Sequence, residues 1–102
     1  MVKKVEYLHR LTPEDKVRTR FTKNRGRILK FVVQYYTKIK KRWLTVMRID
    51  NCHSYPHKHT YHLRKKEFVL VLSQDNNTAL TEAQNFIKNN FKKIKENFLF
   101  SR

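Results

Sequence analysis

The sequence predicts an α+β fold, in which an antiparallel meander sheet of about four strands packs against one long C-terminal amphipathic helix. Two observations predict it. Between residues 28 and 73, short runs of alternating apolar and polar residues are separated by basic or turn-forming segments. After residue 78, apolar residues recur every three or four positions, which is the spacing of one helix face. With 102 residues, the chain is long enough for one modest core.

The strands are predicted at residues 28–39, 43–50, 57–62 and 67–73, with basic turns around residues 38–42 and 64–66. On the first strand, one apolar face is formed by Leu29, Phe31, Val33, Tyr35 and Ile39. On the second strand, alternation puts Arg48 and Asp50 on the same face. Trp43 falls on the other face and is expected in the core rather than as a stacking platform.

The helix is predicted over residues 79–99, because its apolar stripe is formed by Leu80, Ala83, Ile87, Phe91, Ile94 and Phe98. Either Thr78 or Thr81 is expected to cap it, and Thr81 with Gln84 could close a capping box. This stripe is interpreted as core packing against the sheet. The opposite sheet face would then carry the polar residues and any ligand.

Residues 1–27 show no sustained period and many basic residues, so we interpret them as a basic N-terminal arm, with a single α+β domain over residues 28–102. A short helical turn after Thr12 is expected at residues 13–15. The arm could be solvated and mobile or could lie along a phosphate backbone. The two interpretations are compatible, since such arms often order on binding.

The charge balance indicates a polyanionic partner. Lys and Arg number 24 against 8 Asp and Glu, which gives a formal net charge of +16. Nucleic acid is the first expectation. No membrane partner is expected, because no apolar run approaches the roughly 18 residues of a spanning helix. One cysteine and no evident signal peptide favour a reducing cytoplasm. A single glycine excludes a glycine-rich phosphate loop.

Residues 50–62 are the candidate site, because they hold four of the five histidines and the only cysteine. RNA can be cleaved through its own 2′-hydroxyl, so a protein must supply a base, an acid and positive charge. We expect His57 and His59 as base and acid, Asp50 to orient a histidine, and Arg48 with Lys58 to bind phosphate. The hypothesis is a metal-independent endoribonuclease.

Two alternatives stay open. His53, His57 and His59 could bind a divalent metal such as zinc, although zinc in so small a protein more often recruits several cysteines, and no cofactor is favoured. Alternatively, the histidines and tyrosines could form a non-catalytic surface for RNA or DNA, or face a protein partner.

Further nucleic-acid contacts are expected from basic residues in and beside the predicted turns. Besides Lys58, these residues are Arg25, Arg27, Lys40, Lys41, Arg42, Arg64 and Lys65. Their charge would bind phosphate without reading sequence.

One pattern resembles a known family. Arg48, Asp50 and Asn51, then a histidine, then Pro56-His57-Lys58-His59, with a strand and a C-terminal helix following, is similar to the TumE-type toxins of prokaryotic toxin–antitoxin pairs. It is similar also to related small proteins with an Arg-x-Asp, His, Pro-His-x-His pattern. The resemblance implies a toxin-like protein with a cognate antitoxin protein as partner. Ile49, where an aromatic is usual, departs from the pattern.

Overall fold

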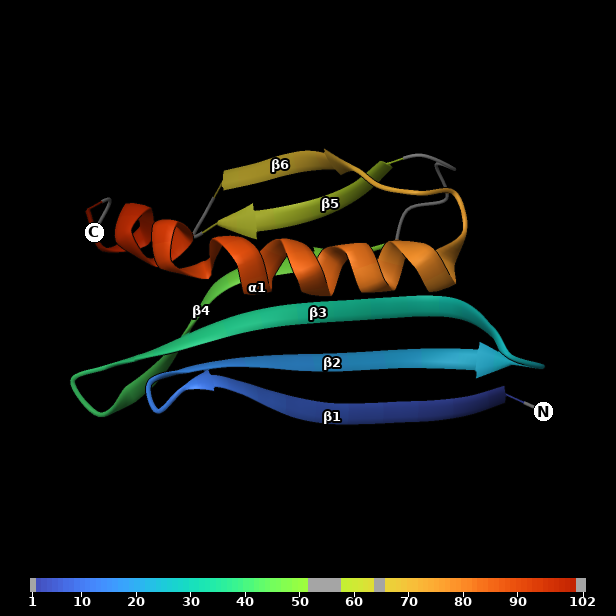
Figure 1. The fold of residues 1–102 in the computed structure, drawn as a ribbon, viewed down its shortest axis with the longest axis horizontal. Helices are drawn as coiled ribbons and strands as arrows, with labels where there is room; N and C mark the ends of the chain where they lie inside the picture. The colour runs from blue at the N-terminus through green and yellow to red at the C-terminus, as the bar shows by residue number, and fades with distance from the viewer. Residues whose placement is uncertain (1, 52–57, 64–65, 101–102) are drawn as a thin grey trace.

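The computed structural model describes residues 2–51, 58–63 and 66–100, with side chains described for residues 2–51 and 72–100. One antiparallel sheet and one helix make up these residues (Figure 1). The strands are β1 (Val2–Thr12), β2 (Asp15–Asn24), β3 (Arg27–Ile39), β4 (Arg42–Asp50), β5 (Lys58–Leu63) and β6 (Lys66–Val71), and the helix is α1 (Asn76–Phe100).

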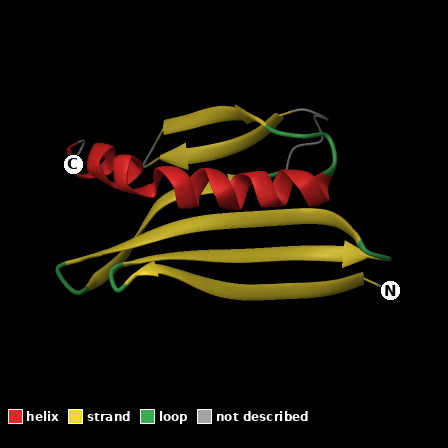
Figure 2. Cartoon of the chain, viewed as in Figure 1, coloured by secondary structure: helices red, strands yellow, loops and turns green. Residues whose placement is uncertain are grey.

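The strands follow one another in the order β1-β2-β3-β4-β5-β6, so the sheet is a meander. Helix α1 crosses one face of it and leaves the other face uncovered in the described chain (Figure 2). The predicted α+β meander with a C-terminal helix is therefore confirmed. The sheet has six strands rather than about four.

The two additional strands lie in the segment predicted as a basic arm over residues 1–27, and that prediction is corrected. Residues 2–24 form β1 and β2, which pair with each other, and β2 pairs with β3. Pro13 and Glu14 make the turn between them instead of a helical turn. On β2, Asp15, Val17 and Thr19 are buried beneath the helix side. Because two of these three inward residues are polar, the alternation is not visible in hydropathy.

The core lies between the sheet and α1. Its largest fully buried side chains come from β3 and β4, among them Phe31, Tyr35, Met47 and Ile49. The helix contributes the predicted stripe, of which Leu80, Ala83, Ile87, Ile94 and Phe98 are buried and Phe91 packs partly buried against the core. Burial of this stripe against the sheet stabilises the fold by roughly 25 cal/mol per Å² of apolar surface.

Two β-bulges change which face some residues occupy. The register between β3 and β4 shifts so that Tyr35 opposes Met47 while Tyr36 opposes Thr45, which inserts Val46 as an extra residue. Trp43 and Thr45 therefore leave the helix side and share the opposite face with Arg48 and Asp50. The predicted core position of Trp43 was wrong for this reason.

The second irregularity lies between β2 and β3, where Thr22 opposes Lys30 and Lys23 opposes Ile28. Leu29 is the extra residue. It is 46% exposed, while Ile28 packs against the core in its place. The predicted apolar face of the first strand is correct for Phe31, Val33 and Tyr35 and wrong for Leu29.

Helix α1 begins three residues before the predicted start, and its cap is Asp75 instead of Thr78 or Thr81. The Asp75 carboxylate accepts hydrogen bonds from the Thr78 backbone N–H at 3.0 Å and from the Thr78 hydroxyl at 2.7 Å. These bonds lower the pKa of Asp75. An acidic side chain at this position also complements the helix dipole.

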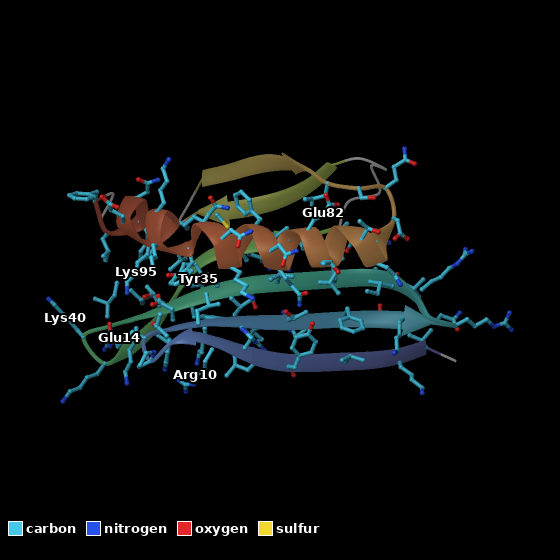
Figure 3. The ribbon with its side chains drawn as sticks, viewed as in Figure 1. Arg10, Glu14, Tyr35, Lys40, Glu82 and Lys95 are labelled. Carbon is cyan, nitrogen blue, oxygen red and sulfur yellow. The ribbon has the colours of Figure 1, made fainter. Side chains whose placement is uncertain are left out.

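A buried carboxylate joins the first hairpin to β3 and α1. Asp15 is 3% exposed, and its Oδ1 accepts hydrogen bonds from the Tyr35 hydroxyl at 2.6 Å and the Thr37 hydroxyl at 2.9 Å. Its Oδ2 accepts one from Thr12 at 2.5 Å, and Lys95 Nζ lies 3.5 Å from Oδ1. Figure 3 labels Tyr35 on β3 and Lys95 on α1.

The network changes the acidity of its members. Burial alone would raise the pKa of Asp15, but the hydrogen bonds from Thr12, Tyr35 and Thr37 together with Lys95 outweigh it, so the pKa lies below its usual range. For Tyr35, burial raises the pKa, and the hydrogen bond to the Asp15 carboxylate raises it further. The carboxylate therefore stays ionised and the phenol stays protonated at neutral pH.

Candidate nucleic-acid interface

The sheet face opposite α1, called the open face below, gathers the basic residues of β1 to β4. The strand register and the burial of alternate residues show which residues lie on this face, where they form rows that run across the strands. Its cations are Lys4, Arg10, Lys16, Arg18, Arg20, Lys30, Lys38 and Arg48. The carboxylates among them are Glu6 and Asp50, and each already pairs with an arginine, Glu6 with Arg18 and Asp50 with Arg48. In the described part of the chain, the other cations of this face have no ion pair.

An aromatic–cation cluster lies on the open face near the β1–β2 and β3–β4 turns. It consists of Arg10, Lys16, Tyr36, Lys38 and Trp43. The Lys16 Nζ is 3.9 Å from the centroid of the Trp43 ring and 5.7 Å from that of Tyr36. Arg10 and Lys38 lie 5.7 Å and 5.9 Å from the Trp43 centroid. The indole ring is thus surrounded by cations that no carboxylate of the described face neutralises, an arrangement suited to anions.

The middle of the open face is held by polar contacts. The Tyr36 hydroxyl donates a hydrogen bond to Gln34 Oε1 at 2.9 Å. Arg18 bonds to Glu6 through its guanidinium, and this bond, followed by one involving Tyr36, raises the pKa of Arg18. The hydrogen bond to Gln34 holds the Tyr36 hydroxyl and limits the movement of its ring. A fixed ring loses little conformational entropy when a flat ligand stacks on it.

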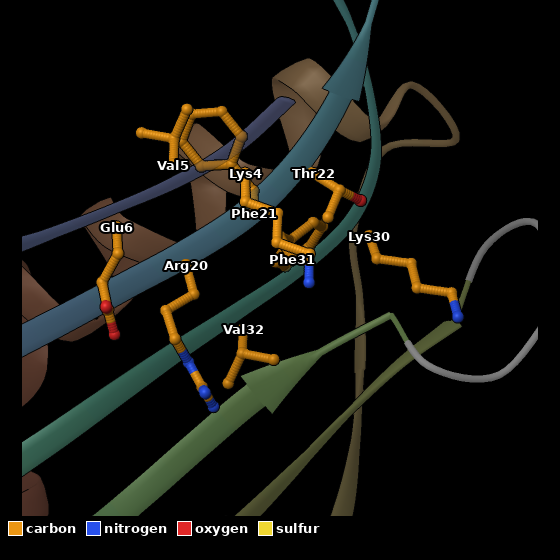
Figure 4. Close-up of a pocket in the computed structure, with 9 residues that line it drawn as sticks. All are labelled: Lys4, Val5, Glu6, Arg20, Phe21, Thr22, Lys30, Phe31 and Val32. Carbon is orange, nitrogen blue, oxygen red and sulfur yellow. The ribbon is translucent and has the colours of Figure 1, made fainter. Parts of the chain in front are cut away.

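A hollow of about 470 Å³ opens on the same face, toward the β2–β3 turn (Figure 4). Six open-face side chains surround it in two rows, Lys4, Thr22 and Lys30 in one and Glu6, Arg20 and Val32 in the other. Val5, Phe21 and Phe31, from the intervening row, complete its lining. Because neighbouring residues of a strand face opposite sides, the side chains of these three residues turn toward the helix side, Phe31 into the core. The floor of the hollow is therefore their backbone, with Val32 as the apolar open-face side chain and long basic side chains at the rim.

The predicted Arg48–Asp50 pair is present on β4. Arg48 Nε lies 2.9 Å from Asp50 Oδ2, and Asp50 is 3% exposed while the Arg48 side chain is 43% exposed. The contact is an ion pair and not a hydrogen bond. Arg48 Nε is a buried donor, and among the described residues it has no hydrogen-bond acceptor. The register places Thr60 opposite Asp50 and His62 opposite Arg48 on β5.

The predicted phosphate-binding residues of the turns are exposed but do not converge. Arg25 and Arg27 lie at the β2–β3 turn, and Lys40, Lys41 and Arg42 lie at the β3–β4 turn. Figure 1 places these turns at opposite ends of a body 42 Å long, and Figure 3 labels Lys40 at one of them. They can contact one ligand only if that ligand runs along the sheet.

The histidine predictions fall largely outside the described residues. His53, His57, Arg64 and Lys65 lie outside them entirely. For Lys58 and His59 the structure gives the strand β5 and its register, with Lys58 opposite Val71 and His59 opposite Leu70. Among residues that the structure describes, no group of three metal-ligating side chains occurs. The zinc alternative for His53, His57 and His59 thus stays a prediction.

Sequence reasoning missed Arg10, Lys16, Lys38 and the surface position of Trp43. A signal was present, because Lys16, Arg18 and Arg20 alternate with Asp15, Val17 and Thr19 in the period of a strand. The location of Trp43 had no such signal, since it depends on the bulge at Val46.

The fold and the open face define a small, strongly basic α+β protein with one helix-covered and one cation-rich sheet face. No helix in the described ranges is long and apolar enough to cross a membrane. The chain belongs to the DUF7718 family, a domain of unknown function, which matches residues 2–102. Comparisons with curated proteins and with solved structures give no match.

Proposed function

We propose that the protein binds RNA, in single-stranded form, along its open face. The observation that supports this most directly is the aromatic–cation cluster, in which Trp43 and Tyr36 lie among Arg10, Lys16 and Lys38 on a sheet face. Unpaired bases stack on aromatic side chains presented by a sheet, and neighbouring cations bind the phosphates. A net charge of +16 supplies the long-range attraction.

Single-stranded RNA fits this surface better than a duplex. In a duplex the faces of the bases are stacked on one another, so aromatic rings on a sheet cannot reach them. The uncovered strands offer a path along which cations recur at every second residue, as at Lys16, Arg18 and Arg20. Single-stranded DNA would use the same contacts. Measuring the affinity for RNA and for DNA of the same sequence shows which of them is preferred.

The test is fluorescence anisotropy with a labelled single-stranded RNA of about 12 nucleotides, within the 4–16 nucleotides of known strand-binding sheets. The triple variant Arg10→Gln, Lys16→Gln, Lys38→Gln is expected to bind at least about tenfold more weakly than wild type. The matched control is Lys88→Gln, Lys92→Gln, Lys93→Gln, which removes the same charge from exposed positions of α1.

The control variant is expected to stay within about threefold of wild type. An equal loss in both triple variants would mean that net charge alone drives binding, and the open face would be rejected as the site. Tighter binding of the DNA of equal sequence would reject RNA as the preferred ligand.

RNA cleavage is the second candidate function, and the Arg48–Asp50 pair favours it. A buried carboxylate beside a half-exposed arginine can hold the guanidinium ready for a phosphate. In the proposed mechanism His57 and His59 act as base and acid, Asp50 as the orienting carboxylate, and Arg48 with Lys58 as phosphate ligands. A TumE-like toxin with an antitoxin partner belongs to the same proposal.

Incubation of the purified protein with RNA, with and without EDTA, tests this candidate. The proposal expects cleavage in both conditions, and cleavage only without EDTA would support the zinc alternative instead. His57→Ala with His59→Ala should abolish cleavage while RNA affinity stays within about threefold. Cleavage at the wild-type rate by this variant would reject the two histidines as catalytic residues.

A further inference from the structure

We infer that the hollow on the open face binds one nucleotide unit of the strand, with its phosphate at the basic rim and its base against Val32. The inference deepens the proposed RNA binding and rests on it. It assigns Lys4, Arg20 and Lys30 to the phosphate and Val32 to the base. None of these residues belongs to the aromatic–cation cluster.

The register explains why these side chains meet. Thr22 lies opposite Lys4 on one side and Lys30 on the other, so two lysines flank a short hydroxyl side chain. In the next row Arg20 lies between Glu6 and Val32. The short side chains of Thr22 and Val32, each beside longer ones, produce the depression, and Figure 4 shows Lys30, Arg20 and Val32 around it.

The charges favour an anion over a neutral ligand. The one carboxylate at the hollow, on Glu6, is neutralised by Arg18. Lys4, Arg20 and Lys30 are exposed and have no ion pair within the described ranges, so their side chains can turn to a phosphate. The Thr22 hydroxyl adds a donor between them. Lysine and arginine with one hydroxyl are common phosphate ligands.

The size of the hollow and the apolar side chain of Val32 favour a nucleotide over a bare phosphate. A volume of about 470 Å³ lies in the range of small-molecule sites, roughly 300–1,000 Å³. A phosphate alone would leave Val32, the apolar open-face side chain of the hollow, uncovered. A base covers such a surface through its flat face.

The hollow also lies in line with the other features of the open face. Arg20 follows Lys16 by four residues on β2, which is about 13 Å at roughly 3.3 Å per residue. Val32 lies opposite Asp50 on β4, so the hollow borders the Arg48–Asp50 pair. One strand can therefore stack at Trp43, pass Arg48 and place a nucleotide in the hollow.

The experiment is an NMR titration of the ¹⁵N-labelled protein with the four nucleoside monophosphates, and separately with inorganic phosphate. We expect millimolar binding of at least one nucleotide, with amide shifts concentrated at residues 4–6, 20–22 and 30–32. Inorganic phosphate should bind at least fivefold more weakly. Equal affinity for phosphate and nucleotides would overturn the inference, because the base would then contribute nothing.

Two variants complete the test. Arg20→Gln with Lys30→Gln should abolish nucleotide binding, and Thr22→Phe should do so by filling the hollow without changing charge. The variant Lys88→Gln, Lys92→Gln, Lys93→Gln should bind nucleotides as wild type does. Unchanged nucleotide binding by Thr22→Phe, with its folded spectrum retained, would also overturn the inference.

Failure of this inference and failure of the proposed function give different results. If RNA binds through the cluster but nucleotides shift no amide at the hollow, only the inference is overturned. If nucleotides bind in the hollow but RNA does not bind the protein, the hollow is supported as a nucleotide site and RNA binding is rejected.

Discussion

Lys16 and Trp43, from two different hairpins, meet on the open face with the lysine Nζ 3.9 Å from the centroid of the indole ring. The contact joins the β1–β2 hairpin to the β3–β4 hairpin without an apolar core on that side. A cation over an aromatic ring contributes about 0.5–2 kcal/mol, depending on its exposure to water. A base that stacks on Trp43 must share or displace this ammonium group, which then lies beside the phosphates.

Because Trp43 is the only tryptophan, its fluorescence reports directly on stacking. RNA binding is expected to quench the emission, and Trp43→Leu should weaken binding by about 1–3 kcal/mol, the contribution of one stacked base. Trp43→Phe keeps a ring and should recover part of the loss. If RNA binds with unchanged emission, or if Leu and Phe weaken binding equally, Trp43 does not stack with a base.

The salt dependence of binding should reveal how many open-face cations contact phosphates. For single strands, the logarithm of the binding constant falls by about 0.7 per contacted phosphate for each tenfold rise in salt. For the variant Arg10→Gln, Lys16→Gln, Lys38→Gln, the slope of the logarithm of the binding constant against the logarithm of the salt concentration should therefore be smaller by up to about 2. Affinities measured between 50 and 300 mM salt test this, with the α1 triple variant as the control. An unchanged slope would show that these three residues contact no phosphate.

The Asp15 network predicts an acid-sensitive contribution to stability. Since the folded pKa of Asp15 is lowered, its ionised form stabilises the fold above the unfolded value of about 3.9, and this stability is lost as pH falls through the folded pKa. Asp15→Asn should lower the free energy of unfolding by about 2–4 kcal/mol at pH 7, because hydroxyl partners lose a charged acceptor.

Urea unfolding at several pH values checks this prediction. The difference between wild type and Asp15→Asn should be constant from pH 7 to about 5 and should shrink toward pH 2. Glu14→Gln is the matched control, since it removes the same charge from the exposed neighbouring position and should change stability by less than about 0.5 kcal/mol. A difference that does not vary with pH would mean that the carboxylate charge is not what stabilises the network.

The helix and the central strands could be predicted from the sequence because their apolar residues repeat in the period of the element. The strands β1 and β2 could not be predicted in this way, because the inward positions on β2 include the polar residues Asp15 and Thr19. Their partners are remote in sequence, among them Tyr35 for Asp15 at 2.6 Å and Gln84 for Thr19 at 3.1 Å. Polar residues satisfied by such partners look like surface residues in a hydropathy pattern.

The candidate site divides in the same way. Arg48 and Asp50 could be placed together, because residues two apart on a regular strand share a face. The surface position of Trp43 could not be predicted, because the extra residue Val46 reverses the alternation of the strand residues that precede Val46. The basic residues of the turns were correctly found at turns, but only the topology shows that the β2–β3 turn with Arg25 and the β3–β4 turn with Lys40 lie at opposite ends of the molecule (Figure 1).

The β3–β4 turn predicts opposite effects on stability and on binding. Lys40 and Lys41 hold left-handed conformations, with φ of 51° and 66°, although this region favours Asn and Gly. Lys40→Asn with Lys41→Gly should therefore raise the free energy of unfolding by about 1–2 kcal/mol. If these lysines contact phosphate, the same variant should bind RNA more weakly, with a slope in salt smaller by up to about 1.4. Urea unfolding and anisotropy titrations measure the two effects.

Gly26→Ala, at a φ of 77° in the β2–β3 turn, is the control that should destabilise by about 1 kcal/mol without changing charge. A stabilised Lys40→Asn, Lys41→Gly variant that binds RNA as tightly as wild type would remove these two lysines from the interface.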